Sequence, residues 1–300
     1  MATHSRRDLV SIGLGLTLVP ACVASHGVAS QQTVPIPHAS DERARRRSMF
    51  WESHDREMLS RLEPLRGAHV LDAGCGSGDH ALVFAALGCA RVVALDLDSE
   101  KVERLSRRVA GSALASRVEP RVGDVTSLPF DASTFDLVWS SHVLHFMVDP
   151  TAVVQELARV TRRRGRVVVR EDRSLTRLLP FDVGLGRPGL ESRAVAAFDE
   201  WLASDRVRRG RVPYGWLGVL RRAGLTGVRA HSVLFELQAP FDETQAAYLR
   251  DLIAWRAREG LSPEDRNTLA ALSVPGGPHD ALARDDLHFV SVSSLYLGQV

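Results

Sequence analysis

A glycine-rich turn near residue 75 is the first place where this chain could hold a ligand. The motif VLDAGCGSG spans residues 70–78, and Asp72 stands just before its first glycine. Its glycines are Gly74, Gly76 and Gly78. Glycine lets the backbone approach a ligand closely, and free N–H groups at a helix start favour a polar ligand group. Because Asp72 can counter a positive charge, we expect a cationic ligand rather than a diphosphate.

Carboxylates also follow the next two apolar segments. Asp96 ends such a segment about 20 residues past the glycines, where nucleotide-binding folds grip a ribose hydroxyl. Leu97 follows it directly, and Asp124 with Val125 follows the third segment. Single aspartates are common at turns, but acids at successive segment ends indicate one ligand site. The nicotinamide-nucleotide fingerprint needs a glycine where Asp79 stands, so that cofactor is disfavoured.

Two histidines could act on an acceptor. His142 and His145 follow the fourth apolar segment, and either imidazole could remove a proton from an acceptor. The alternative is that His142 lines the cofactor pocket and His145 packs structurally. No metal site is expected, because Glu171 and Asp172 alone do not supply the cluster of carboxylates that a divalent cation needs.

An alternation of β-rich and helical segments must position these residues. We expect strands at 69–73, 91–95, 118–122, 135–140 and 166–170, with helices at 81–87, 99–108 and 151–160. Such alternation predicts parallel strands joined by right-handed crossovers. The result is an α/β fold with a doubly wound sheet, which binds ligands at the carboxyl ends of its strands.

The C-terminal part follows a different pattern. We expect helices at 190–203 and 216–223, and final strands at 228–237 and 289–297. These strands complete a seven-stranded, mostly parallel, Rossmann-like sheet. Residues 240–287 carry a helical pattern at 244–259 and a helix start at Ser262. We interpret 240–287 as a helical insertion before the last strand that caps the site.

Five motifs resemble those of class I S-adenosylmethionine-dependent methyltransferases, in the small-molecule branch that includes the quinone C-methyltransferases. They are VLDAGCGSG, VVALDLD, GDVTSLPF, FDLVWSSHVLHFMVDP and RRRGRVVVRED. The resemblance implies S-adenosyl-L-methionine as cofactor. It implies that the methionine part is held by Asp72, Gly74 and Gly76, the ribose by Asp96, the adenine by Asp124 with Val125, and that Ser140 lines the pocket. Gly78 and Leu97 are expected in the same cofactor site. The insertion departs from the family pattern, so no acceptor residues are implied.

The expected reaction is methyl transfer to a small-molecule acceptor. The donor is already activated, so the protein supplies mainly proximity, alignment and a dry cavity. The apolar face of the expected cap favours a hydrophobic or aromatic acceptor. A formal net charge of +2, from 38 basic and 36 acidic residues, gives no basic surface for nucleic acid. One alternative is a non-catalytic nucleotide-binding or scaffold protein. A second, an NAD-dependent oxidoreductase, is disfavoured by the acidic residues Asp72 and Asp79.

Residues 1–40 resemble an export leader, and we assign the methyltransferase domain to 41–300. A twin arginine at 6–7 precedes an apolar stretch, and Cys22 lies in a loose lipoprotein box. The apolar stretch is shorter than the roughly 20 residues that span a bilayer. The alternative is that translation begins near Met49. A genuine leader predicts export or membrane anchoring, whereas a spurious one predicts a cytoplasmic enzyme.

Overall fold

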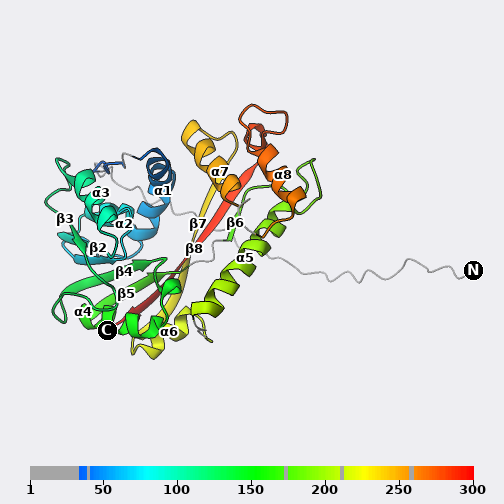
Figure 1. Ribbon diagram of the computed structural model, residues 1–300. Helices are drawn as coiled ribbons and strands as arrows, with labels where there is room; N and C mark the ends of the chain where they lie inside the picture. The colour runs from blue at the N-terminus through cyan, green and yellow to red at the C-terminus, as the bar shows by residue number, and fades with distance from the viewer. Residues whose placement is uncertain (1–33, 39–40, 172–174, 210–212, 257–259) are drawn as a thin grey trace, which may run out of the picture. The chain divides into compact units, whose positions relative to one another are not determined.

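An eight-stranded sheet forms the centre of the fold (Figure 1). The computed structural model describes residues 34–38, 41–171, 175–209, 213–256 and 260–300. The strands are β1 His69–Ala73, β2 Arg91–Asp96, β3 Val118–Val122, β4 Phe135–Ser141, β5 Thr161–Arg170, β6 Leu175–Arg177, β7 Thr226–Gln238 and β8 His288–Gln299. Their order is β3-β2-β1-β4-β5-β8-β6, with β7 paired to β8.

The pairing of the strands confirms a doubly wound α/β fold. Strands β1 to β5 pair in parallel, whereas β8 runs antiparallel to β5, β6 and β7. All seven expected strands are present. The eighth, β6, pairs only Leu175–Arg177 with β8, and three residues are too few to show a periodic pattern in the sequence.

Eight α-helices accompany the sheet in the described residues. They are α1 Glu42–Ser60, α2 Asp79–Ala86, α3 Ser99–Val109, α4 Pro150–Val160, α5 Leu190–Arg209, α6 Trp216–Arg222, α7 Glu243–Arg256 and α8 Pro263–Leu272. Polar side chains cap the starts of several of them, including α4 and α8. The side chain of Asp149 accepts from Thr151 N at 2.9 Å, and that of Ser262 accepts from Asp265 N at 3.1 Å.

The two faces of the sheet carry separate cores. On one face, α1, α2 and α3 pack against alternate strand residues that include Val70, Val92 and Trp139. On the other face, α4 and α6 pack against Leu71 and Val93. Strands buried on both faces read as continuous apolar runs, which explains why the sequence predicts them well.

Helices α7 and α8 lie between β7 and β8, as expected for a helical insertion at 240–287. They form a third core with α5, with the amino-terminal end of β8 and with Phe50 of α1. Within this core the Phe50 ring stacks on Tyr248 of α7, with ring centroids 4.0 Å apart. The insertion is therefore tied to α1.

The compact unit runs from Val34 to Val300, so it begins before the expected boundary at residue 40. Ile36 is buried in the core, and the backbone oxygen of Val34 accepts from Arg56 of α1 at 2.9 Å. The twin arginine at 6–7 and Cys22 lie outside the described residues. Among the helices that the structure describes, none is both long enough and apolar enough to cross a bilayer.

Candidate active site

The glycine turn joins β1 to α2 at the carboxyl edge of the sheet. The backbone nitrogens of Gly74 and Cys75 both donate to Leu95 O of β2, at 2.8 and 2.9 Å. The nitrogen of Gly76 donates to Asp96 Oδ2 at 2.8 Å. These bonds hold the turn against the tip of β2, so the first two expected cofactor motifs lie together.

The three glycines of this turn have different reasons to be glycine. All three have positive φ, at 80°, 55° and 80° for Gly74, Gly76 and Gly78. A Cβ on Gly74 would lie 2.3 Å from Val143 Cγ2, and a Cβ on Gly78 would lie 2.4 Å from Leu105 Cδ1. A Cβ on Gly76 would meet no atom within 4 Å. Only Gly76 therefore faces space that a ligand could fill.

Asp72 is a buried carboxylate with unused hydrogen-bonding capacity. Its side chain is 1% exposed, and its Oδ2 has no hydrogen-bond partner among the described residues. Burial raises the pKa of Asp72 to about 7, against the opposing effect of nearby His80. Such a group fits a cationic ligand, because an ammonium would supply both the missing hydrogen bond and the missing charge.

The other expected cofactor residues lie at the tips of β2 and β3. Asp96 Oδ1 accepts from Asp98 N at 3.0 Å and lies 3.9 Å from Lys101 Nζ. The apolar side chain of Leu97 is 70% exposed beside it. Asp124 is exposed and caps its own turn, whereas Val125 is buried. An exposed leucine next to carboxylates suits the flat face and the hydroxyls of a nucleoside.

Ser140, expected to line the pocket, is buried on β4. Its Oγ donates to Ala73 O of β1 at 3.0 Å, so its hydroxyl links the two strands. The neighbouring Ser141 Oγ is buried and has no hydrogen-bond partner among the described residues.

The two histidines follow β4 and lie beside the tip of β5. His142 has a φ of 57°, and its nitrogen donates to Arg170 O at 2.9 Å. Burial, reinforced by the Arg170 charge, lowers the pKa of His142 to about 3, so this imidazole is neutral. His145 Nδ1 lies 2.8 Å from Glu171 Oε2.

Glu171 organises this segment. Its Oε1 accepts from Val143 N at 2.8 Å and from Leu144 N at 2.7 Å, while Oε2 faces the His145 imidazole. From the sequence, Glu171 with Asp172 was judged insufficient for a metal site, and its pairing with His145 was not predicted. One donor atom from each of His142, His145 and Glu171 lies within 4.8 Å of the others, so among described residues they are the group with metal-ligand chemistry.

Helix α1 also contributes to this region, which the sequence analysis did not expect. Asp55 is buried, and its Oδ1 lies 3.6 Å from His80 Nε2 and 3.8 Å from Arg170 Nη1. Although burial opposes it, the neighbouring His80 and Arg170 side chains hold the pKa of Asp55 below its ordinary value. Helix α1 thus connects the glycine-turn helix α2 with the tip of β5.

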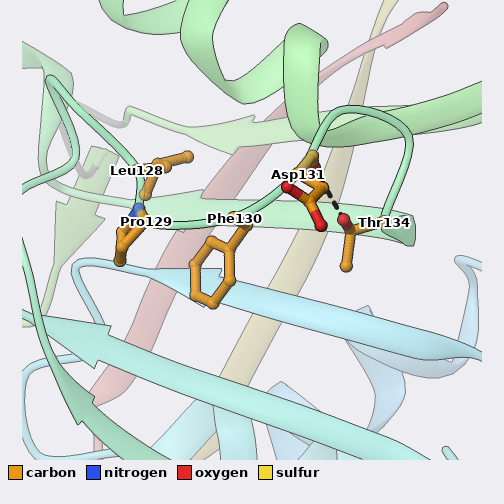
Figure 2. Close-up of a pocket in the computed structure, with 5 residues that line it drawn as sticks. All are labelled: Leu128, Pro129, Phe130, Asp131 and Thr134. Atoms are coloured by element: carbon orange, nitrogen blue, oxygen red, sulfur yellow. Dashed lines mark hydrogen bonds between the residues drawn. The ribbon is translucent and has the colours of Figure 1, made fainter.

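A surface hollow of about 450 Å³ lies away from the glycine turn and the two histidines (Figure 2). It is lined by Leu128, Pro129, Phe130, Asp131 and Thr134. Thr134 directly precedes β4, so the hollow lies at the amino end of that strand. The glycine turn and the histidines lie at the carboxyl ends, where ligands of doubly wound sheets bind.

Comparison with known proteins agrees with this geometry. Residues 71–169 match the model of a methyltransferase domain. The chain is 31% identical over 158 residues to the 27-O-demethylrifamycin SV methyltransferase of Amycolatopsis mediterranei, which covers 50% of this chain and 57% of the relative. It is 40% identical over 110 residues to the demethylmenaquinone methyltransferase of Clavibacter sepedonicus, which covers 37% of this chain and 43% of the relative. The chain thus spans about half the length of these relatives.

The fold has a counterpart among solved structures. Phosphoethanolamine N-methyltransferase 2 of Haemonchus contortus superposes with a TM-score of 0.50 at 18% sequence identity, over 86% of this chain and 57% of that one. Together, the sheet order, the glycine turn and the family match identify residues 71–169 as a class I S-adenosylmethionine-dependent methyltransferase domain. This confirms the resemblance of the motifs and the expected cofactor.

Proposed function

We propose that the whole chain is an enzyme that transfers the methyl group of S-adenosylmethionine to a small-molecule acceptor, with His145 as the base. The 2.8 Å contact between His145 Nδ1 and Glu171 Oε2 carries this proposal. Val143, between the two histidines, packs on Gly74, so the His145–Glu171 pair adjoins the cofactor turn.

The residues at the strand tips fit this cofactor. Asp72, whose Oδ2 lacks a partner among the described residues, would receive the ammonium of the methionine part. Asp96 would accept from the ribose hydroxyls, with Leu97 and Val125 against the adenine. When bound, the cofactor supplies a methyl group on a positively charged sulfur.

The protein's own part in the chemistry is proton removal and alignment. Glu171 would accept a hydrogen bond from His145 Nδ1–H and orient the imidazole, so that Nε2 is the atom that takes the proton of an acceptor hydroxyl or carbon acid. The buried carboxylate then stabilises the imidazolium that forms. His142, with its lowered pKa, stays neutral and lines the site.

The acceptor is a small molecule in this proposal. The relatives named for a demethylrifamycin and a demethylmenaquinone support this class. The aromatic side chains between α1 and α7 support a hydrophobic or aromatic acceptor rather than nucleic acid.

We place the active enzyme in the cytoplasm, where its cofactor is made. A cleaved, exported form in cell fractionation would contradict this.

The first experiment is calorimetry of the full chain with S-adenosylmethionine, S-adenosylhomocysteine and NAD. We expect micromolar affinity for the two sulfur compounds, about −8 kcal/mol, and none for NAD. Binding of NAD alone, or of none of the three, would contradict the proposal.

The second experiment tests the base. We expect His145→Ala and Glu171→Gln to slow methyl transfer to a panel of phenols and enols by about 100-fold while leaving S-adenosylhomocysteine affinity unchanged. A chelator should have no effect on the wild type. Unchanged turnover in both variants would remove the role of the pair.

A further inference from the structure

Four buried polar side chains lie together where α1 packs on the carboxyl end of β5 and the middle of β8. They are His54, Asp55, Arg170 and Ser293, named here the α1 polar cluster. None is more than 9% exposed. The nitrogen of His142 donates to Arg170 O at 2.9 Å, and Glu171 is the next residue along the chain. The Arg170 charge helps to lower the pKa of His142, whose ring centroid lies 6.2 Å from that of His145, so the α1 polar cluster lies near the proposed base.

The hydrogen bonds within the cluster determine which nitrogen of His54 carries the proton. Arg170 Nη2 donates to Ser293 Oγ at 2.8 Å, and His54 Nε2 lies 3.0 Å from the same Oγ. If Ser293 donates its hydroxyl proton to Nε2, the hydroxyl is fully used and only His54 Nδ1–H remains. If Nε2 donates instead, both the Ser293 proton and the Nδ1 lone pair lack partners. The first tautomer leaves fewer buried groups unpaired and is therefore favoured.

His54 Nδ1–H is then a donor with no acceptor among the described residues. The side chain is 1% exposed, so water does not reach it freely. Burial lowers the pKa of His54 to about 4, which keeps the imidazole neutral at physiological pH. A buried donor without a partner is rare in proteins, and such a group is usually completed by a bound water, an ion or a ligand atom.

Aromatic rings surround this donor. The His54 ring stacks on the Phe235 ring of β7, with ring centroids 5.0 Å apart. The ring centroid of Trp51 lies 5.5 Å from that of His54. Asp55 lies 3.8 Å from Arg170, so the carboxylate and the guanidinium offset each other's charge. Ser141 Oγ, which also lacks a partner in the described chain, lies on β4 in register with Arg170. This setting favours an uncharged, aromatic group that bears oxygen.

We propose that His54 is a specificity-determining residue whose Nδ1–H donates to a carbonyl oxygen on an aromatic acceptor. This inference rests on the proposed function, because it places the acceptor next to His145. It narrows the acceptor class from hydrophobic molecules in general to carbonyl-bearing aromatic ones. It also gives α1 a role in orienting the acceptor.

The test compares two fragments that differ in one group, 4-hydroxyacetophenone and 4-ethylphenol. Their affinities are measured by calorimetry on the full chain saturated with S-adenosylhomocysteine. We expect the ketone to bind the wild type about tenfold more tightly, as one buried hydrogen bond allows. In His54→Phe that preference should disappear while 4-ethylphenol affinity stays within about twofold.

Further variants separate recognition from structure. His54→Gln keeps an N–H donor and should retain part of the preference for the ketone. Ser293→Ala removes the hydroxyl that keeps the His54 proton on Nδ1, so it should reduce that preference. His231→Phe changes an exposed histidine on β7 and should change nothing. If His54→Phe does not fold, the Gln and Ala variants still decide the matter.

The outcomes distinguish this inference from the function itself. An equal loss for both fragments in His54→Phe, no preference in the wild type, or no binding of either fragment would overturn the role of His54. In each of those cases intact binding of S-adenosylhomocysteine would leave the methyltransferase proposal standing. Failure of the wild type to bind S-adenosylhomocysteine would instead contradict the proposed function.

Discussion

At the scale of single residues, Gly76 and Gly78 separate ligand binding from packing. Alanine at either position costs about 1–2 kcal/mol, because both have positive φ. Only Gly78→Ala adds a clash, with Leu105, of the kind that costs about 1–3 kcal/mol more. We therefore expect Gly78→Ala to lose more stability in urea unfolding, and Gly76→Ala to lose more affinity for S-adenosylmethionine in calorimetry. The reverse ranking would show that Gly76 does not face the cofactor.

Asp72 links the cofactor site to pH. The folded protein keeps the Asp72 proton up to about pH 7, whereas the ordinary pKa is 3.8. The folded state thus binds more protons between these values, and its free energy of unfolding falls as pH rises through this window. Asp72→Asn cannot titrate, so at pH 8 the ligand-free variant should have a higher Tm than the wild type, and near pH 4 the two should agree.

The same residue predicts a pH dependence of binding. An ammonium pairs with Asp72 only when the carboxylate is ionised, so affinity of the wild type for S-adenosylmethionine should weaken as pH falls below about 7. Asp72→Asn should bind at least about tenfold more weakly at pH 8 and show a flat profile. Calorimetry at several pH values checks this, and a wild-type profile as flat as that of the variant would contradict it.

Residue types and spacing predicted which residues lie together at the ends of β1 and β2, but not the partners of the histidines. Asp72, Asp96 and the glycines follow strands in one motif each, so their positions can be predicted locally. The partner of His145 could not be assigned in this way, because Glu171 reaches it from a different strand. His54 and Asp55 were missed since their contacts to Ser293 and Arg170 join residues far apart in the chain.

At the scale of secondary structure, α1 is the element that the sequence analysis failed to predict. No helix was expected at 42–60, although Asp41 caps α1 by accepting from Ala44 N at 2.8 Å. Its buried residues Phe50, His54 and Met58 recur every fourth position. The polar member of that series, His54, obscures the apolar stripe that would indicate a helix.

Phe50 gives a direct test of how α1 is held. It is 4% exposed and stacks on Tyr248 in the third core, whereas its neighbour Met49 is 39% exposed. We expect Phe50→Ala to lower the free energy of unfolding by about 3–5 kcal/mol, because it leaves a cavity between α1 and α7. Met49→Ala is the matched control and should change it by less than about 1 kcal/mol in urea unfolding. Equal effects would show that α1 does not depend on this core.

At the scale of the whole molecule, three hydrophobic cores hold different parts of the fold in place. The two cores on the faces of the parallel sheet support the strand ends at which we propose that the cofactor binds. The strands of these cores are continuous apolar segments, which made the fold predictable from the sequence. The third core joins α1 to the insertion and to β8. Its contacts connect residues almost two hundred positions apart, such as Trp51 Nε1, which donates to Tyr248 Oη at 2.8 Å. No local pattern could predict that arrangement.

The start of the folded unit follows from the same long-range contacts. Ile36 is buried at 6% exposure, Val34 O accepts from Arg56, and Pro37 O accepts from Arg108 of α3. A chain that begins at residue 34 keeps these contacts, whereas one that begins at 41 loses them. Arg56 and Arg108 then each lose one backbone acceptor, although they keep Glu52 and Asp79, and the buried Ile36 side chain is lost from the core. We therefore expect 34–300 to match the Tm of the full chain, and 41–300 to melt several degrees lower, since a loss of about 1 kcal/mol lowers Tm by about 2–4 °C at this size. Ile36→Ala in the full chain should reproduce part of that loss in calorimetric melting. If 41–300 melts with the full chain, the segment at 34–38 contributes nothing to the fold, and the domain begins at the boundary near residue 40 that the sequence predicts.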